Sequence, residues 1–113
     1  MSPLALDVYR RLVHRAKSAK PSITYGELAA LVGGLHPRSP SLHAALGEVS
    51  NACRHNALPC LPAIVWKRGL NRPSSGYYAV AHPRAQTETA QVKAWERERE
   101  RVMTEIEKFP AKL

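Results

Sequence analysis

The chain contains little of what builds a disulfide framework or a membrane span. Its 113 residues include two cysteines, Cys53 and Cys60, too few for the cross-linked scaffold of a small secreted domain. No apolar run approaches the roughly 18 residues that a bilayer crossing requires. The first residues, MSPLALDVYRRLVHR, also lack the continuous apolar stretch and cleavage site of a secretory signal. We therefore expect a cytoplasmic protein with reduced thiols and no contact with a membrane.

Acidic residues are scarce in most of the chain. Residues 1–85 contain 11 lysines and arginines against 3 acidic residues, whereas residues 86–113 contain 6 of each kind. The whole excess charge of +8 therefore lies in the first 85 residues. A basic domain of this kind is typical of proteins that bind nucleic acid or another polyanion.

The same scarcity of carboxylates argues against several enzyme classes. Five histidines could serve a nuclease, but a catalytic metal ion would also need carboxylate ligands, which the basic part hardly supplies. Cys53, His55 and Cys60 lie close together in sequence, yet their spacing matches no structural zinc site, and Cys53 fits a core position. No glycine-rich phosphate loop or nucleophile elbow is present. We expect no enzymatic activity, no metal ion and no cofactor.

Two helices are expected in the N-terminal third of the chain. Serine followed by proline, the residue types preferred at a helix start, precedes apolar residues that recur at every fourth position through residues 3–19. Thr24 is followed three residues later by Glu27, which predicts a capping box for a helix beginning at Tyr25. Two consecutive glycines at 33–34 then end this second helix.

A third helix is expected to begin at the dipeptide Ser39-Pro40. Its apolar side has the spacing of one helical face and consists of Leu42, Leu46, Val49 and Cys53. The opposite side has no apolar side chain and consists of His43, Gly47, Ser50 and Arg54. The helix therefore offers one face to a core and a second, small and polar face to a ligand.

Two short runs typical of β-strands follow the third helix. The sequences AIVWKR (63–68) and YYAV (77–80) are rich in β-branched and aromatic residues, and the segment GLNRPSSG (69–76) between them is typical of a turn. We therefore expect a β-hairpin. The cations and hydroxyls gathered on and beside its turn are Lys67, Arg68, Arg72, Ser74 and Ser75.

The last part of the chain predicts a linker and then a charged helix over residues 91–109. The charges of this helix balance, so we do not expect it to lie on nucleic acid. Its apolar stripe consists of Trp95, Val102, Met103, Ile106 and Phe109. The stripe must be buried either against the rest of the chain or against a second copy in a homodimer, and the sequence leaves both open.

The order of these elements predicts a small α+β fold of the winged-helix type. Three helices and a β-hairpin would form a basic domain over residues 1–85, with an extra C-terminal helix in residues 86–113. The second and third helices would form a helix-turn-helix pair and the hairpin would be the wing. A wing that touches a phosphate backbone explains the cations of the turn. A small α+β domain with a basic turn is the alternative.

Residues 22–66 resemble one family of DNA-binding proteins. The segments ITYGELAALVG and ALGEVSNACRHNALPCLPAIV are similar to the helix-turn-helix region of the DNA alkyltransferase and alkyltransferase-like family. The resemblance implies a winged-helix DNA-binding domain in which Tyr25 helps to rotate a damaged nucleotide out of the duplex. However, Ala44 stands where the family has its intercalating arginine, and no His or Arg follows Cys60 as in the family's reactive Pro-Cys-His-Arg motif. We therefore expect the scaffold without alkyl transfer, and we do not infer base flipping.

Taken together, the sequence predicts a non-enzymatic protein that binds nucleic acid, with duplex DNA favoured, through its third helix and its wing. The residues expected to contact the nucleic acid are Tyr25, Arg38, Ser41, His43, Gly47, Ser50, Arg54, Lys67, Arg68, Arg72, Ser74 and Ser75. The role of Tyr25 stays open, because its hydroxyl can bond a phosphate or its ring can pack at the edge of the core. The alternative function is a small phage or mobile-element protein that binds and inhibits a nucleic-acid-handling protein.

Overall fold

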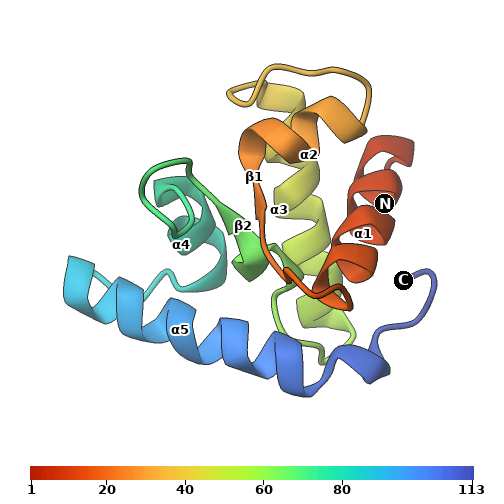
Figure 1. Ribbon diagram of the computed structural model, residues 1–113. Coiled ribbons are helices and arrows are strands. Elements are labelled where there is room, and N and C mark those ends of the chain that lie inside the picture. Colours follow the sequence, from red (N-terminus) through yellow and green to blue (C-terminus); the bar gives the residue numbers. More distant parts are fainter.

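The computed structural model describes residues 1–113 and shows an α+β fold dominated by helices (Figure 1). In chain order the elements are α1 (Pro3–Ala16), β1 (Ile23–Thr24), α2 (Tyr25–Leu31), α3 (Pro40–His55), the 3-10 helix η1 (Leu61–Ile64), β2 (Val65–Trp66), α4 (Ser75–Ala81), α5 (Glu88–Thr104) and the 3-10 helix η2 (Ile106–Lys108). The α+β class predicted from the sequence is confirmed. None of the helices combines the length and the apolar character that a bilayer crossing requires.

The helix starts predicted from capping residues are confirmed. The Ser2 hydroxyl accepts a hydrogen bond from the main-chain N–H of Ala5 at 3.1 Å, which fixes the start of α1. Thr24 and Glu27 form the reciprocal capping box of α2, with the two bonds at 3.1 and 3.2 Å. α3 begins at Pro40 as predicted. Helix α1 ends about one turn earlier than the sequence predicted.

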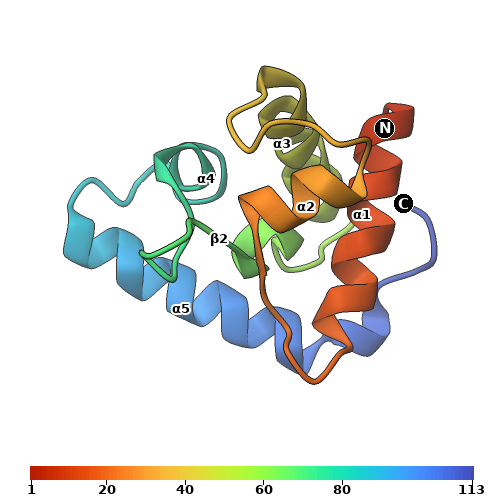
Figure 2. The same cartoon turned by 45° about the horizontal axis from the view of Figure 1, so that its top comes forward.

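Helix α3 is the central element of the fold. In both ribbon views α1 stands on one side of it and α4 on the other (Figure 1, Figure 2). The apolar side of α3 belongs to the core, since its four stripe residues are all buried: Leu42, Leu46, Val49 and Cys53. The opposite side of α3 faces α4, so α4 covers the polar residues of α3.

A two-stranded parallel sheet joins the first and second halves of the chain. Ile23 pairs with Val65, and Thr24 pairs with Trp66. Ile23 and Val65 are buried and contribute to the core. Because Thr24 is also the N-cap of α2, the sheet holds the start of α2 next to the segment that follows β2.

The predicted β-hairpin does not form. β2 pairs in parallel with β1, and the predicted strand 77–80 belongs to helix α4. Neighbouring side chains of a strand point to opposite faces, whereas Tyr77 and Tyr78 are both buried, at 8% and 5% exposure. A helix turns by about 100° per residue, which lets both neighbouring rings face the interior. The aromatic character of this segment therefore reflects packing and not strand formation.

Helix α5 crosses the side of the molecule that η1 forms (Figure 1). The Trp95 indole N–H donates a hydrogen bond to the Ala63 carbonyl at 2.8 Å, and both Trp95 and Phe109 are buried. The Arg99 guanidinium lies 5.1 Å from the Trp95 ring centroid and 5.7 Å from that of Trp66. These residues of the apolar stripe are therefore buried against the chain itself, and the possible homodimer stays a prediction.

Candidate functional site

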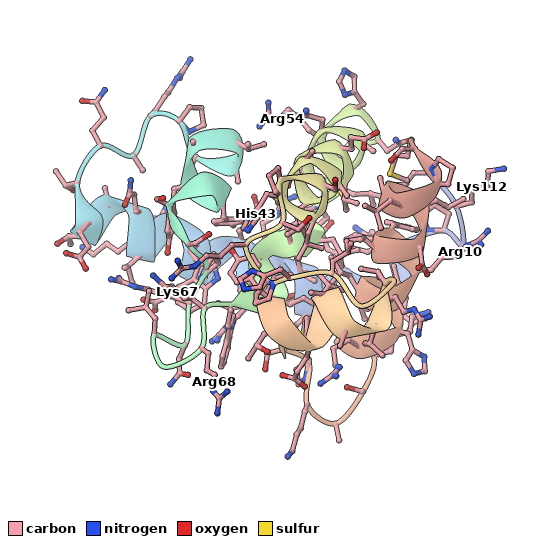
Figure 3. All side chains as sticks on the ribbon, turned by 90° about the horizontal axis from the view of Figure 1, so that it is seen from above. Arg10, His43, Arg54, Lys67, Arg68 and Lys112 are labelled. Carbon is pink, nitrogen blue, oxygen red and sulfur yellow. The ribbon has the colours of Figure 1, made fainter.

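A cleft of about 790 Å³ opens between the start of α2, the loop before α3 and the segment that joins β2 to α4. The basic side chains that line it are Arg38, His43, Lys67 and Arg68. Figure 3 shows His43 near the middle of the view from above, with Lys67 and then Arg68 below it. The four residues come from three separate segments of the chain, so the fold, rather than sequence proximity, brings them together.

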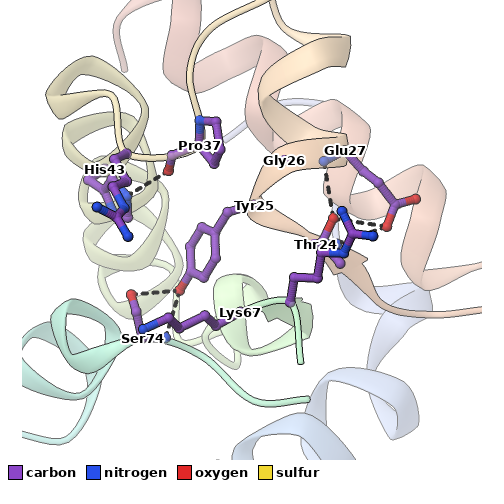
Figure 4. A pocket seen from close by; sticks show the side chains of 10 residues that line it. Thr24, Tyr25, Gly26, Glu27, Pro37, His43, Lys67 and Ser74 are labelled. Atoms are coloured by element: carbon purple, nitrogen blue, oxygen red, sulfur yellow. Dashed lines mark hydrogen bonds between the residues drawn. The ribbon is translucent and has the colours of Figure 1, made fainter. Parts of the chain in front are cut away.

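Tyr25 lines this cleft and is held there by two neighbours (Figure 4). Its hydroxyl accepts hydrogen bonds from the main-chain N–H and the hydroxyl of Ser74, at 3.0 and 3.1 Å. Its ring stacks on His43, with 5.3 Å between ring centroids and 28° between ring planes. The His43 Nε2 atom lies 3.1 Å from the Pro37 carbonyl oxygen. Tyr25, at 8% exposure, is thus an aromatic residue at the edge of the core whose hydroxyl is already bonded within the chain.

The cleft carries positive charge that the chain does not neutralise. No ion pair within the chain involves the three cleft cations, Arg38, Lys67 and Arg68. The one acidic residue of the lining, Glu27, lies 3.6 Å from Arg15. The hydrogen bond from the Thr24 main-chain N–H holds the pKa of Glu27 below its ordinary value, and Arg15 lowers it further. An anionic ligand would therefore meet three free cations and a carboxylate that is already engaged.

The turn after β2 presents two cations to the cleft but directs Arg72 elsewhere. A main-chain hydrogen bond from the Lys67 N–H to the Arg72 carbonyl, at 2.8 Å, closes the turn. Gly69 and Asn71 adopt φ angles of 83° and 58°, the left-handed region that glycine and asparagine tolerate best. Arg72 forms an ion pair with Glu88 at the start of α5. The group of three turn cations expected from the sequence is thus divided.

The polar side of α3 is not the open surface that the sequence predicted, because α4 packs against it. Ser50 is buried, and its hydroxyl accepts a hydrogen bond from the Cys60 thiol at 3.2 Å. The Arg54 guanidinium donates a hydrogen bond to the main-chain carbonyl of Val80 in α4. Gly47 lines a smaller hollow of about 70 Å³ between the two helices. This cover was not predicted, because the residues of α4 have the composition of a strand.

Two further predicted contacts, Ser41 and Ser75, are exposed near the starts of α3 and α4 and do not line the cleft. Conversely, Gly26 lines the main cleft and Gly76 lines the smaller hollow, and the sequence analysis singled out neither. Both are the second residue of a helix. Glycine inside a predicted helix is unusual, so Gly26 could have pointed to this surface, whereas Gly76 lies in a segment predicted as a turn, where glycine is ordinary.

Neither cysteine has the environment of a nucleophile. Burial raises the pKa of the Cys53 thiol to about 11 and that of the Cys60 thiol to about 12. A thiol needs a lowered pKa or a nearby base to react as a thiolate. The structure also shows no group of three or more His, Cys, Asp or Glu side chains placed to hold a metal ion.

Six of the predicted contact residues meet at the main cleft: Tyr25, Arg38, His43, Lys67, Arg68 and Ser74. Comparison of the chain with models of protein families, with curated proteins and with solved structures gives no match. The chemistry of the cleft is therefore the basis for assigning a function.

Proposed function

We propose that the protein binds nucleic acid without enzymatic activity and that the cleft receives the phosphate groups. The observation that carries this proposal is the convergence of three cations without ionic partners, from two separate segments, on one open cleft. Like charges held close together repel each other and gain nothing for the fold alone. A phosphodiester chain would offset this repulsion, and the release of its counterions would favour binding.

We also infer a winged-helix-like arrangement for this binding. α2 and α3 take the place of a helix-turn-helix pair, as in the alkyltransferase-like domains that residues 22–66 resemble. The basic turn after β2 takes the place of the wing. Because α4 occupies the polar side of α3, the contacts come from the rim of the cleft and from the basic turn. Contacts to phosphate carry little sequence information, so we expect binding that tolerates many sequences.

The salt dependence of binding tests this proposal. Fluorescence anisotropy with labelled duplex DNA, single-stranded DNA and RNA gives the slope of log K against log salt concentration for each. A double variant, Lys67→Ala with Arg68→Ala, should reduce the size of this slope by up to about two units, because each phosphate contact contributes roughly one. Its thermal stability should hardly change, since exposed substitutions usually alter the free energy of unfolding by about 0.5 kcal/mol or less.

The matched control is a second double variant, Arg10→Ala with Lys112→Ala. It removes the same charge from exposed positions that Figure 3 shows well away from Lys67 and Arg68. A reduced slope in the cleft variant alone separates contact at the cleft from loss of overall charge. Equal slopes in the two variants, or no affinity for any nucleic acid at low salt, would overturn the proposal. Inhibition of a protein partner would then be the function to test.

A further inference from the structure

Two smaller hollows between α3 and α4 adjoin the cleft, and we call the cleft and these two hollows together the furrow. Tyr25 and His43 line both the main cleft and the smaller hollow. Ser50 lines that hollow and also a third one, which reaches Arg54. The helical distance from position 43 to position 54 is roughly 16 Å, at 1.5 Å per residue. Figure 3 shows, from top to bottom, Arg54, His43, Lys67 and Arg68. Basic side chains therefore stand at both ends of an elongated furrow.

Three glycines along this furrow have no structural reason to be glycine. Gly26, Gly47 and Gly76 lie within helices and line the main cleft or the hollow beside it. A Cβ atom would meet nothing within 4 Å at Gly47 or Gly76, and only the Thr24 hydroxyl at 4.0 Å at Gly26. By contrast, Gly33, Gly34 and Gly69 have positive φ angles, a backbone conformation that favours a residue without a side chain. Glycine in a helix interior is unfavourable relative to alanine, so no contact within the chain accounts for glycine at position 47.

His43 supplies an aromatic ring at the centre of the furrow. One face of the ring rests on Tyr25, yet His43 is still exposed. Its hydrogen bond with the Pro37 carbonyl helps to hold the ring in place. A ring that is fixed on one side and open to solvent is a platform on which a planar group can stack.

We propose that the furrow binds a single strand of nucleic acid, with one base stacked on His43 and the phosphates held by the cations of the cleft. This inference rests on the proposed function and specifies its ligand. A charged groove that follows the backbone, combined with aromatic rings for the bases, is how proteins bind single strands with little sequence preference. The glycines of the furrow allow the sugar-phosphate chain to approach the helices closely.

The shape of the furrow favours a single strand over a duplex. A length of roughly 16 Å is about half of one turn of duplex, which rises about 34 Å. A helix that enters the major groove must present an open side, and the polar side of α3 is covered by α4, with Ser50 buried. A duplex would reach only the rim of the cleft, whereas a single strand can place a base against His43.

Substitution of His43 tests the stacking. The probe is labelled oligo(dT), compared with a duplex that carries the same number of phosphates. We expect tighter binding of oligo(dT), and His43→Ala should weaken it by roughly 5- to 150-fold, the effect of losing one stacked base. His43→Phe keeps a ring without a charge and should restore most of the lost affinity. Equal losses in the two variants would show that the imidazole acts through charge or hydrogen bonding, and would overturn the stacking.

Filling the furrow tests the role of the glycines without changing any charge. Gly47→Leu places a side chain in the hollow and should weaken oligo(dT) binding at least tenfold while leaving the fold intact. Asn51→Leu is the matched control, because Asn51 is exposed on the same helix and does not line the furrow. Circular dichroism confirms that each variant folds. Should Gly47→Leu fail to fold, Gly76→Val fills the same hollow from α4.

The outcomes separate this inference from the proposed function. Binding of duplex as tight as that of oligo(dT), or oligo(dT) binding that neither His43→Ala nor a folded filling variant weakens, would overturn the single-strand inference. The proposed function would survive that result if the Lys67→Ala and Arg68→Ala pair still reduced the salt slope on duplex. The absence of binding to every nucleic acid would reject both.

Discussion

The hydroxyl of Tyr25 accepts hydrogen bonds from both the main-chain N–H and the side-chain hydroxyl of Ser74, 49 positions later in the chain. Tyr25 is the first residue of α2, and Ser74 immediately precedes α4. The pair therefore connects two segments that both line the cleft (Figure 4). The contact holds the start of α2 against the segment that precedes α4.

Tyr25→Phe should destabilise the fold. The change removes the acceptor and leaves the partly buried N–H of Ser74 without a partner, so we expect a loss of about 1–3 kcal/mol in the free energy of unfolding, measured by urea denaturation. Ser74→Ala keeps the main-chain bond and should cost less, about 0.5–1.5 kcal/mol. The double variant should cost no more than Tyr25→Phe plus a few tenths, since the serine hydroxyl then has no partner to lose. Fully additive losses would contradict this coupling.

Cys53 and Cys60 should be inert in the folded protein. Because burial raises both thiol pKa values, to about 11 and about 12, the thiolate that reacts is nearly absent at pH 7. We expect very slow reaction with Ellman's reagent, and rapid reaction of both thiols once urea unfolds the chain. Intact-mass measurement after incubation with a methylated-guanine oligonucleotide should show no added methyl group. A stoichiometric gain of one methyl would show that a cysteine is an alkyl acceptor after all.

His82 should make stability depend on pH. Burial lowers its pKa below the ordinary value of 6.5, and its Nε2 atom lies 2.9 Å from the Tyr77 hydroxyl. A histidine with a lowered folded-state pKa stabilises the fold above its unfolded pKa, and this contribution declines as pH falls from about 6.5 towards the folded pKa. The urea concentration at the unfolding midpoint should therefore decrease as the pH is lowered through this window. His82→Gln should remove this part of the pH dependence, and an unchanged profile would contradict the role of burial.

Trp95 should be essential to the stability of the whole chain. It is buried, and its indole N–H is bonded to Ala63 in η1. Trp95→Ala should cost about 3–5 kcal/mol in the free energy of unfolding, the usual effect of removing a buried aromatic ring. The control is Arg97→Ala, an exposed position of the same helix, with an expected change of about 0.5 kcal/mol or less. Similar small changes in both variants would show that α5 folds apart from the rest of the chain.

Local chemistry made the first half of the fold predictable. The Thr24–Glu27 capping box and the Ser39-Pro40 dipeptide located the starts of α2 and α3, because capping depends on residues close in sequence. The apolar stripe of α3 identified its buried side for the same reason, since one helical face is set by spacing alone.

The region after β2 was not predictable in the same way. Tyr77 and Tyr78 have the composition of a strand, and their helical conformation depends on packing against segments far away in the sequence. That error concealed α4 and, with it, the burial of Ser50. The cleft was predicted only in part: its basic residues were identified from charge, but Arg72 pairs with Glu88 in a segment that the sequence offered as a linker.

The parallel pairing of β1 with β2 also constrains the order of folding. A hairpin can close through its own turn, whereas this pair waits until residues 65–66 reach residues 23–24, across a loop that includes all of α3. α2 is too short to persist in water before its start is anchored. On the ribosome, the first two helices would therefore remain without their final contacts until β2, and then Trp95, had emerged. We expect the chain to fold as one cooperative unit after synthesis rather than helix by helix during it.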